Sequence, residues 1–453
     1  MKEKKLDAIS PVDGRYRDKV DSISKYFSEK ALIYYRLKVE IEYFLFLCKN
    51  RIGKLKPLSS KNNKNLRDIY NNFSIKDAIE IKKIEEKTNH DVKAVEYFIK
   101  KKFDQYELTN YKEFIHFGLT SQDINNTAIP LSVKEFINNI YLPELDKLIK
   151  YLDKISKKYK DITIISRTHG QPASPTKLGK EILVFSTRIK NQRKILVKIP
   201  NSAKFGGAVG NFNAHKVAFP KIKWKTFGKR FVESELGLDY SFPTTQIEHY
   251  DSFASLCDNV RRINNILLDL SLDTWTYISL DYFKQKINKD EVGSSAMPHK
   301  VNPIDFENAE GNIGLANSIF DFFSNKLTKS RLQRDLSDST VLRNIGVPFS
   351  HTIISIKSII KGLDKLIVNK SKINADLEEN WIIISEAIQT ILRREGYPNP
   401  YESLKELTRK NTSITKEILH KFIDTLEVNK KIKDELKVIT PSNYTGILNY
   451  EFQ

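Results

Sequence analysis

Sulfur-containing residues and long apolar runs are both scarce in this chain. Only two of its 453 residues are cysteine, Cys48 and Cys257, and they fit no metal-binding or redox spacing. We therefore expect both to be buried as small hydrophobic side chains. The longest apolar run, residues 43–48, is far shorter than the roughly 20 apolar residues that span a bilayer. These absences exclude a disulfide scaffold and a membrane-spanning helix.

Motifs that bind metals or nucleotide cofactors are also missing. The eight histidines are dispersed, and no two have a zinc-ligand spacing. The chain contains neither a Walker-type phosphate loop nor a Gly-x-Gly-x-x-Gly fingerprint, since the glycines at 206–210 have a different spacing. We therefore expect no metal and no cofactor. The basic start, residues 2–7, leads into no apolar stretch, so no signal peptide is expected and the predicted location is the cytoplasm.

The net charge is strongly positive, at +19, from 75 Lys and Arg against 56 Asp and Glu. Such a balance is compatible with nucleic-acid binding or with attraction of anionic small molecules. The lysines, however, are spread along the whole chain and mixed with isoleucine and asparagine, which indicates compositional bias and solvated helix faces. The predicted partners therefore include neither nucleic acid nor a membrane.

Apolar residues recur at alternating steps of three and four over several long segments, a pattern typical of amphipathic helices. Strand signals are scarce, and residues 162–165 are the best candidate. The predicted fold class is all-α, with a long-helix bundle as its core that extends between subunits. The apolar positions that predict this bundle are Leu145, Leu148, Leu152 and Ile155, then Ile182, Phe185 and Ile189, then Leu256, Val260, Ile263, Leu267 and Leu270, and finally Ile313, Ala316, Phe320, Phe323 and Leu327.

The length of the chain suits about three domains. Helical periodicity near the start, interrupted by a polar stretch, predicts an N-terminal helical domain over residues 1–115. The long periodic segments predict a central bundle domain over 116–348. A further periodic region predicts a C-terminal helical domain over 349–453.

Residues 293–303 contain the most informative stretch of the chain. Two small hydroxyl residues, Ser294 and Ser295, follow a glycine, and Lys300 lies just before a predicted helix. Asn302 is a good N-cap, the proline after it suits the first helical position, and two acidic residues follow in the first turn, so the helix is predicted to start at Asn302. A lysine beside unpaired backbone N–H groups makes an anion site. The alternative is a flexible connector in a lysine-rich protein.

Three other polar stretches lie at predicted turns. Thr120 or Ser121 can cap the helix that follows, and an ordinary cap and an anion site are equally compatible with these residues. His169 lies between glycine and proline residues, where an imidazole is available for proton transfer. Residues 88–91 lie in a gap between charged helical segments, and His90 there is either a capping or a functional residue.

The pattern Ser-Ser-x-Met-Pro-x-Lys-x-Asn at 294–302 resembles the signature of the fumarase/aspartase superfamily, whose members eliminate fumarate from succinyl compounds. Over essentially its whole length the chain is similar to the adenylosuccinate lyase family of the bacterial type. Many members carry Arg where this chain has Val301, so a charge beside Lys300 is not implied. The motifs that match in order lie at residues 10–16, 88–91, 120–121, 167–172, 245–246, 334–335 and 339–343.

The resemblance implies a carbon–nitrogen lyase of purine nucleotide biosynthesis. Such an enzyme releases fumarate from adenylosuccinate, giving AMP, and from succinylaminoimidazole carboxamide ribotide, giving the free carboxamide ribotide. It further implies that Ser294 is the base, that His169 is the acid, and that Glu307 pairs with the catalytic histidine and fixes its tautomer. A homotetramer with active sites shared between subunits is also implied.

The resemblance assigns the remaining site residues to binding of the anionic nucleotide substrates. Lys300 and Asn302 hold the succinyl carboxylate. Phosphate binding falls to Arg15, Tyr16, Arg334, Ser339 and Arg343, because guanidinium groups suit a dianionic phosphate. The other implied substrate-binding residues are Asn89, His90, Asp91, Thr120, Ser121, Gln246, Ser295, Val301, Asn308, Thr340, Val341 and Leu342.

Two alternatives are open, one within the same superfamily and one from a different class of protein. Argininosuccinate lyase or another fumarate-releasing relative is disfavoured by His299 within the signature and by residues 13–16. A catalytically silent helical scaffold, or a basic nucleic-acid binder with this fold, would have lost residues at the acid, base or carboxylate positions. None of these is lost, so the enzyme is the prediction that we adopt.

Overall fold

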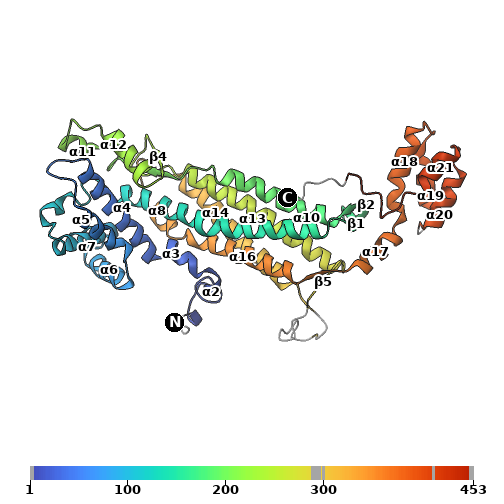
Figure 1. Cartoon of the computed structure of the whole chain (residues 1–453), viewed down its shortest axis with the longest axis horizontal. Coiled ribbons are helices and arrows are strands. Elements are labelled where there is room, and N and C mark those ends of the chain that lie inside the picture. Colours follow the sequence, from blue (N-terminus) through green and yellow to red (C-terminus); the bar gives the residue numbers. More distant parts are fainter. Residues whose placement is uncertain (1–4, 287–296, 298–300, 411–413, 448–453) are drawn as a thin grey trace. The chain divides into compact units, whose positions relative to one another are not determined.

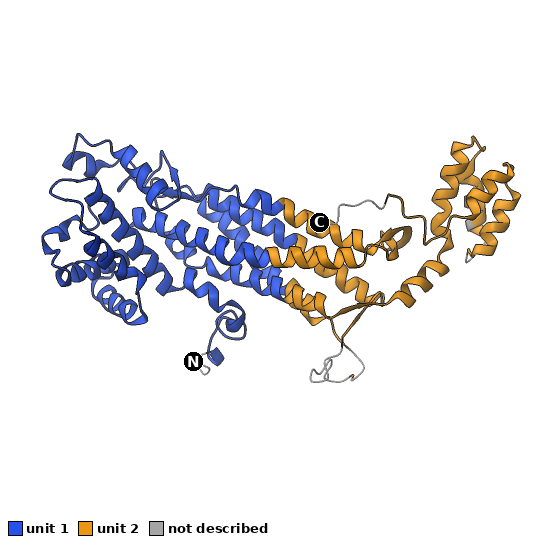
Figure 2. Ribbon diagram, viewed as in Figure 1, with its two compact units in different colours: residues 1–145, 192–265, 311–357 blue, residues 146–191, 266–310, 358–453 orange. Residues whose placement is uncertain are grey.

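The computed structural model describes residues 5–286, 297, 301–410 and 414–447, and these residues are mostly helical (Figure 1). The chain divides into two compact units (Figure 2). Unit 1 contains residues 1–145, 192–265 and 311–357, and unit 2 contains residues 146–191, 266–310 and 358–453. The predicted division into three domains remains a prediction. No helix within the described ranges combines the length and the apolar character needed to cross a membrane.

Five long helices contribute residues to both units. The predicted apolar positions in them are all buried, as expected where steps of three and four place side chains on one helix face. The structure thereby confirms the central helices that the sequence predicts. The five are α9 (Leu142–Lys158), α10 (Leu178–Leu196), α13 (Asp251–Ser279), α14 (Ile304–Leu327) and α16 (Gly346–Asp364).

The core of unit 1 surrounds α4 (Glu29–Lys49), which has buried residues on all sides. A helix that is apolar around its circumference requires neighbours on every face. Both cysteines are buried, as predicted. The other helices of unit 1 are α2 (Arg17–Val20), α3 (Ser24–Phe27), α5 (Ser60–Asn71), α6 (Ile75–Thr88), α7 (Asp91–Gln105), α8 (Ser121–Phe136), α11 (Asn213–Ala218), α12 (Trp224–Arg230) and α15 (Ser337–Leu342). The strands β3 (Ser202–Lys204) and β4 (Asp239–Ser241) pair in parallel. The short 3₁₀ helices are η1 (Asp21–Ile23) and η2 (Thr109–Phe114), and the π-helical segments are η3 (Ile137–Tyr141) and η4 (Phe231–Glu235).

Unit 2 contains two small antiparallel sheets and a group of short helices. The strand β1 (Thr163–Thr168) pairs with β2 (Gln171–Lys177), and β5 (Phe283–Gln285) pairs with β6 (Leu366–Val368). The helices that follow are α17 (Lys370–Glu379), η5 (Trp381–Ile384), α18 (Ser385–Arg394), α19 (Pro400–Lys410), α20 (Lys416–Thr425) and α21 (Lys430–Lys437).

The β1–β2 hairpin extends the strand that the sequence predicts at 162–165. β1 continues to Thr168, and β2, which the sequence analysis does not predict, contains Pro172 and Pro175. Proline lacks an N–H donor and is tolerated in a strand that has a neighbour on one side only. An irregularity between Ile165 and Ser166 adjusts the pairing opposite Pro175.

The start of α14 differs from the prediction. The helix begins at Ile304, and the carbonyl of Pro303 accepts hydrogen bonds from the N–H groups of Phe306 and Glu307. The cap position is therefore Pro303, and the prediction of Asn302 as N-cap is wrong by one residue. Propensity assigns helix ends only to within one or two residues.

Candidate active site

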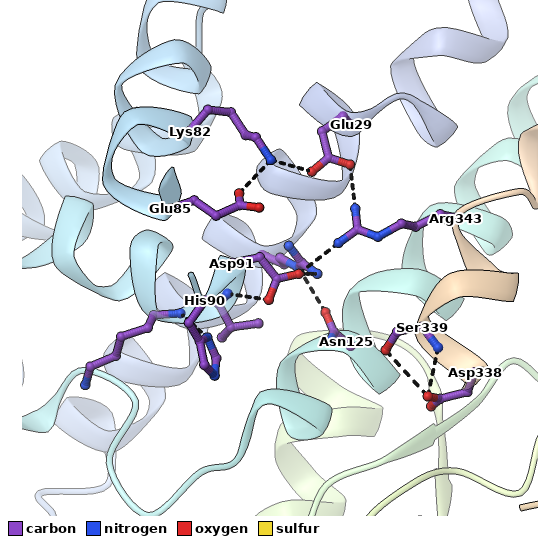
Figure 3. A network of polar contacts seen from close by, with 12 residues as sticks. Glu29, Lys82, Glu85, His90, Asp91, Asn125, Asp338, Ser339 and Arg343 are labelled. Carbon is purple, nitrogen blue, oxygen red and sulfur yellow. Dashed lines mark hydrogen bonds and ion pairs between the residues drawn. The ribbon is translucent and has the colours of Figure 1, made fainter. Parts of the chain in front are cut away.

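A cluster of charged side chains in unit 1 joins helices that are distant in sequence (Figure 3). Asp91, the first residue of α7, accepts from Arg36 Nη2 at 2.6 Å and from Arg343 Nη2 at 3.0 Å through its Oδ2 atom. Arg36 is buried, and its Nε donates to Asn125 Oδ1 at 2.9 Å. The carboxylate of a predicted substrate-binding residue is thus fixed between two guanidinium groups.

Arg343, which directly follows α15, joins Asp91 to Glu29 in this cluster. Its Nη1 lies 2.6 Å from Glu29 Oε2 at the start of α4, and Lys82 Nζ lies 3.5 Å from the other oxygen of Glu29 (Figure 3). Arg343 is still partly exposed, with 40% of its side chain accessible. It can therefore bind an anion on its open side while Asp91 and Glu29 fix its orientation.

The turn before α7 has a special backbone. Asn89 ends α6 with a φ of 50°, in the left-handed region that asparagine tolerates. His90 is the N-cap of α7, and its Nδ1 accepts from the Lys93 N–H at 3.1 Å. The structure therefore gives His90 a capping role, one of the two readings that the sequence leaves open.

Electrostatics keep Asp91 ionised. Burial favours the neutral carboxyl, but the charge of Arg36, the N–H of Val92 and the charge of Arg343 outweigh it and hold the pKa of Asp91 below its ordinary value. Burial also lowers the pKa of Arg36, although Asp91 opposes that shift.

A second group of predicted residues meets around Arg334. Its Nη1 donates to Gln246 Oε1 and its Nη2 to Ser339 Oγ, both at 3.1 Å, and Nη2 lies 3.6 Å from Asp338 Oδ1. Tyr250 Oη donates to the other oxygen of Asp338 at 3.0 Å. The structure thus brings together three residues from motifs that are separated in sequence.

Thr120 is the N-cap of α8, as predicted, and Ser121 is the first residue of that helix. The Thr120 N–H donates to Asp123 Oδ2 at 2.8 Å. Asp123 Oδ1 lies 2.7 Å from Lys204 Nζ, and both side chains are 0% exposed. The N–H groups of Gly206 and Gly207 also donate to Asp123, at 2.8 and 3.1 Å.

This buried ion pair is connected to the Arg334 group through the segment after β3. Gln246 Nε2 donates to the carbonyl of Ala208 at 3.0 Å, while its oxygen accepts from Arg334. The order of contacts is therefore Thr120, Asp123, the glycine segment, Gln246 and Arg334. A charge pair with no solvent contact is costly to form, and its direct contact with Thr120 and its connection through the glycine segment to Gln246 indicate a role in holding these residues.

The remaining predicted residues of unit 1 are placed as follows. Arg15 is exposed, and its guanidinium lies 6.0 Å from the centre of the Tyr16 ring. Thr340 is exposed on α15, whereas Val341 and Leu342 are buried, so the last two can offer a ligand only their backbone.

Unit 2 carries the predicted acid. His169 and Gly170 form the two-residue turn of the β1–β2 hairpin, with φ values of 53° and 74°. Two successive positive φ values are typical of a type I′ turn, which fits the twist of the strands. The imidazole of His169 is exposed at this turn.

The predicted residues around α14 have well-defined partners in the described part of unit 2. Trp275 Nε1 donates to Glu307 Oε1 at 3.2 Å, and Ser358 Oγ donates to Asn308 Oδ1 at 3.0 Å. Gln285 Nε2 donates to the Val301 carbonyl at 2.9 Å, next to Asn302. The predicted pairing of Glu307 with the catalytic histidine remains a prediction. Three further calls, Ser294, Ser295 and Lys300, lie outside the described residues.

Sequence reasoning missed several residues that organise these groups. Asp123 had a local signal, because Thr-x-x-Asp at a helix start is a capping-box pattern. Lys204 had no local signal in the sequence, because its partner Asp123 is 81 positions away. Arg36 and Glu29 likewise meet their partners only in the folded unit. Over the described ranges, no three His, Cys, Asp or Glu side chains are arranged to hold a metal ion.

Comparison with solved structures tests the predicted fold. The fold matches that of a fumarate lyase from Mesorhizobium sp. BNC1 with a TM-score of 0.74 at 16% identity, covering 94% of this chain and 95% of that one. It matches β-carboxy-cis,cis-muconate cycloisomerase from Acinetobacter calcoaceticus with a TM-score of 0.69, also at 16% identity, over 94% of this chain and 95% of the other. These likenesses confirm the predicted all-α fold.

Comparison with related sequences shows the family to which the chain belongs. Residues 14–316 match the Lyase family, and residues 330–445 match the family described as Adenylosuccinate lyase C-terminal. The chain is 57% identical to an adenylosuccinate lyase of Dictyostelium discoideum over 98% of this chain and 97% of the relative. It is 46% identical to that of Escherichia coli K12, over 98% of both chains. The chain therefore belongs to the adenylosuccinate lyase family, which confirms the resemblance of its ordered motifs.

Proposed function

We propose that this chain catalyses the β-elimination of fumarate from adenylosuccinate, giving AMP. The second substrate is succinylaminoimidazole carboxamide ribotide, which gives the free carboxamide ribotide. The observation that carries this proposal is the meeting of Gln246, Arg334 and Ser339, three residues that the family resemblance assigns to the substrate, in one hydrogen-bonded group. The Arg334 guanidinium donates to two uncharged acceptors and lies 3.6 Å from Asp338, and a guanidinium fixed in this way suits a phosphate or carboxylate of the substrate.

The chemistry requires three kinds of group. A weakly acidic C–H beside a carboxylate must lose its proton, the charge that develops must be held, and the leaving nitrogen must gain a proton. We assign these roles to Ser294 as base, to Lys300 and Asn302 as carboxylate holders, and to His169 as acid. Glu307 fixes the histidine tautomer. The exposure of His169 supports its assignment, because an imidazole at the end of a hairpin is accessible to a substrate.

The nucleotide is held by the charged groups of unit 1. Arg334, Ser339 and Arg343 bind the phosphate together with Arg15 and Tyr16. The partial exposure of Arg343 supports this, since 40% of its side chain stays accessible while Glu29 and Asp91 are paired with its two terminal nitrogens. Asn89, His90, Asp91, Thr120, Ser121, Gln246, Ser295, Val301, Asn308, Thr340, Val341 and Leu342 complete the proposed binding set.

The active assembly is a homotetramer, with His169 and the serine segment contributed by different subunits. Large apolar side chains that remain exposed on the long helices support a subunit interface. We also retain the three-domain division at 1–115, 116–348 and 349–453, and the cytoplasm as the location. The exposed apolar side chains on α13 and α14 are Leu272, Trp275, Ile304, Leu315 and Phe322.

The direct test is to incubate the purified protein with adenylosuccinate and to measure fumarate and AMP. A second incubation with succinylaminoimidazole carboxamide ribotide tests the second substrate. We expect both to release fumarate. The matched control is Ser294→Ala, which should still bind substrate but lose about 10²–10⁴-fold in turnover. Absence of fumarate with both substrates would refute the proposed activity and favour the scaffold alternative.

Subunit mixing tests the shared site. Ser294→Ala and His169→Ala proteins, each inactive, are combined under conditions that allow subunits to exchange. A site built from two different chains then regains both groups in about one quarter of cases on random association. If exchange is demonstrated and activity stays at the level of the single variants, both residues act within one chain.

A further inference from the structure

Asp376 joins two elements of unit 2 that carry proposed active-site residues. It lies on α17, in the C-terminal part of the chain, and is 7% exposed. Its Oδ2 atom lies 2.9 Å from Arg167 Nη2 and accepts a hydrogen bond from Tyr282 Oη at 2.7 Å. Its Oδ1 atom lies 3.2 Å from Lys372 Nζ. One carboxylate therefore contacts the β1–β2 hairpin and the chain just before β5.

The contact with Arg167 fixes the hairpin next to its turn. Arg167 is paired with Pro172, and the following pair, Thr168 with Gln171, closes the turn made by His169 and Gly170. Only the last pair of the ladder separates the Arg167 anchor from His169. A two-stranded hairpin is only marginally stable by itself in water, so this contact near the turn, together with the Ser174 hydroxyl that donates to Glu386 further along β2, helps to set where the turn lies.

The contact with Tyr282 reaches the segment before α14. The carbonyl of Tyr282 accepts from the Asn369 N–H at 2.8 Å, and the next residues form β5. Gln285, the last residue of β5, donates through Nε2 to the Val301 carbonyl at 2.9 Å. The proposed carboxylate-binding residue Asn302 follows directly. Asp376 is thus connected to the hairpin turn through Arg167 and the Thr168–Gln171 pair. It is connected to the segment of Asn302 through Tyr282, β5 and the contact of Gln285.

The state of the carboxyl suits such a junction. Burial favours the neutral form, but the Tyr282 hydroxyl, Lys372 and Arg167 outweigh it and keep the pKa of Asp376 below its ordinary value. The ionised carboxylate accepts from all three donors at once. Charge-assisted hydrogen bonds of this kind are stronger and more directional than neutral ones.

We propose that Asp376 is a positioning residue for the elimination, which acts through Arg167 on the hairpin of His169 and through Tyr282 on the segment of Asn302. This inference rests on the proposed function. It assigns the C-terminal part of the chain a role in placing both the acid and the carboxylate-binding segment of that chain, which the proposed tetramer contributes to different active sites, without contact between Asp376 and the substrate. A misplacement of about 1 Å in such an arrangement is worth up to about 10²-fold in rate.

The test combines kinetics with hydrogen exchange. Asp376→Asn keeps the shape of the side chain and removes its charge, and we expect kcat to fall by about ten- to hundredfold with KM changed less than about twofold. Tyr282→Phe removes one hydrogen bond only and should lower kcat by a smaller factor. The control is Asp424→Asn, which removes an exposed carboxylate paired with Lys437 elsewhere in the C-terminal part. Its kcat should match that of the wild type.

A double-variant cycle separates positioning from general stability. If Asp376 acts through His169, then adding Asp376→Asn to a His169→Ala protein should cost much less than it costs in the wild type. Amide exchange of β1, β2 and β5 should be faster in Asp376→Asn, while that of α20 stays unchanged. Full additivity in the cycle, or unchanged exchange in the three strands, overturns the proposal even when the wild type is active. A wild type that releases no fumarate overturns the proposed function, and this inference with it.

Discussion

The two units place their functional side chains by different means. In unit 1, Arg334, Arg343 and Asp91 are held by several side-chain partners each, and Arg334 is connected through Gln246 to the segment that contacts the fully buried ion pair between Lys204 and Asp123. In unit 2, the imidazole of His169 is exposed, and the backbone of a two-residue turn sets its position. The groups proposed to bind the substrate are fixed directly by side-chain contacts, whereas the imidazole proposed to move a proton is placed by its backbone turn and, through Arg167, by Asp376.

This difference has an energetic basis. A buried ion pair is destabilising when one partner is lost, so residues near Lys204 cannot change independently. An exposed turn buries little side-chain surface, and it constrains only the residues that adopt positive φ values. We therefore expect substitutions in unit 1 to affect stability and those at the hairpin turn to affect turnover.

The largest expected effect is on turnover, at His169. His169→Asn should lower kcat by about 10²–10⁴-fold because it removes a proton-transfer group, while asparagine tolerates the left-handed backbone of the turn. Its melting temperature should match that of the wild type. His169→Ala should lose the same turnover and some stability as well. Steady-state kinetics and thermal unfolding measure both, and near-normal turnover of His169→Asn would rule out His169 as the acid.

The next effect is on stability, at the buried ion pair. Lys204→Met leaves the Asp123 carboxylate buried without its cation, and we expect the free energy of unfolding to fall by about 3–5 kcal/mol. The control is Lys49→Met, which removes the cation of an exposed pair with Glu235 and should cost less than about 1 kcal/mol. Chemical denaturation measures both variants. Equal losses would show that burial of the pair at Lys204 has no special energetic role.

A third effect is a pH dependence that arises in the core of unit 1. Burial lowers the pKa of His215 to about 4, and its Nε2 lies 3.1 Å from Tyr43 Oη. The unfolded chain binds this proton at a pKa of about 6.5 and the folded chain does not, so stability is lost as pH falls through this window. The contribution between pH 7.5 and pH 5 is about 2 kcal/mol.

Denaturation at several pH values checks this expectation, with His215→Gln as the matched variant. The Gln amide can replace the Nε2 donor but does not titrate, so the variant should lose less stability on acidification. The pKa of His116 shifts in the opposite direction from that of His215. Burial lowers it, but the neighbouring Glu40 outweighs burial, so the pKa of His116 is raised. Identical pH profiles of wild type and variant would contradict the assignment to His215.

The smallest expected effect is at Glu29. This carboxylate competes with any bound anion for Arg343, so Glu29→Gln should lower KM for adenylosuccinate by a factor of about two to five, through roughly 0.4–1 kcal/mol. The pair is exposed on both sides, so stability should change by less than about 1 kcal/mol. Initial rates measure KM. A higher KM would show instead that Glu29 is needed to orient Arg343.

Features that depend on local pattern could be predicted from the sequence. The long helices were predicted because apolar residues at steps of three and four indicate one buried helix face. The cap at Thr120 was predicted because a hydroxyl residue precedes a helical segment. The family resemblance supplied Arg334, Ser339 and Gln246 from separate motifs. The structure places these three side chains in contact, and no single sequence motif predicts that contact.

Features that depend on distant contacts could not be predicted. Lys204 is one of many lysines, and only the fold shows that it is buried against Asp123. Asp376 is equally inconspicuous on a charged helix. The strand β2 was missed because two prolines argue against a strand, while the pairing with β1 outweighs that local preference. The start of α14 was misplaced because asparagine is the better cap by propensity, yet Pro303 occupies the position.

The separation of Asp91 and Arg343 by 252 positions has a consequence for protein synthesis. A growing chain carries Asp91 and Arg36 long before Arg343 has been added. At about 5–20 residues per second, this interval lasts roughly 10 to 50 s. A nascent chain therefore cannot complete this charge cluster, which we propose to bind the nucleotide, until Arg343 has been added.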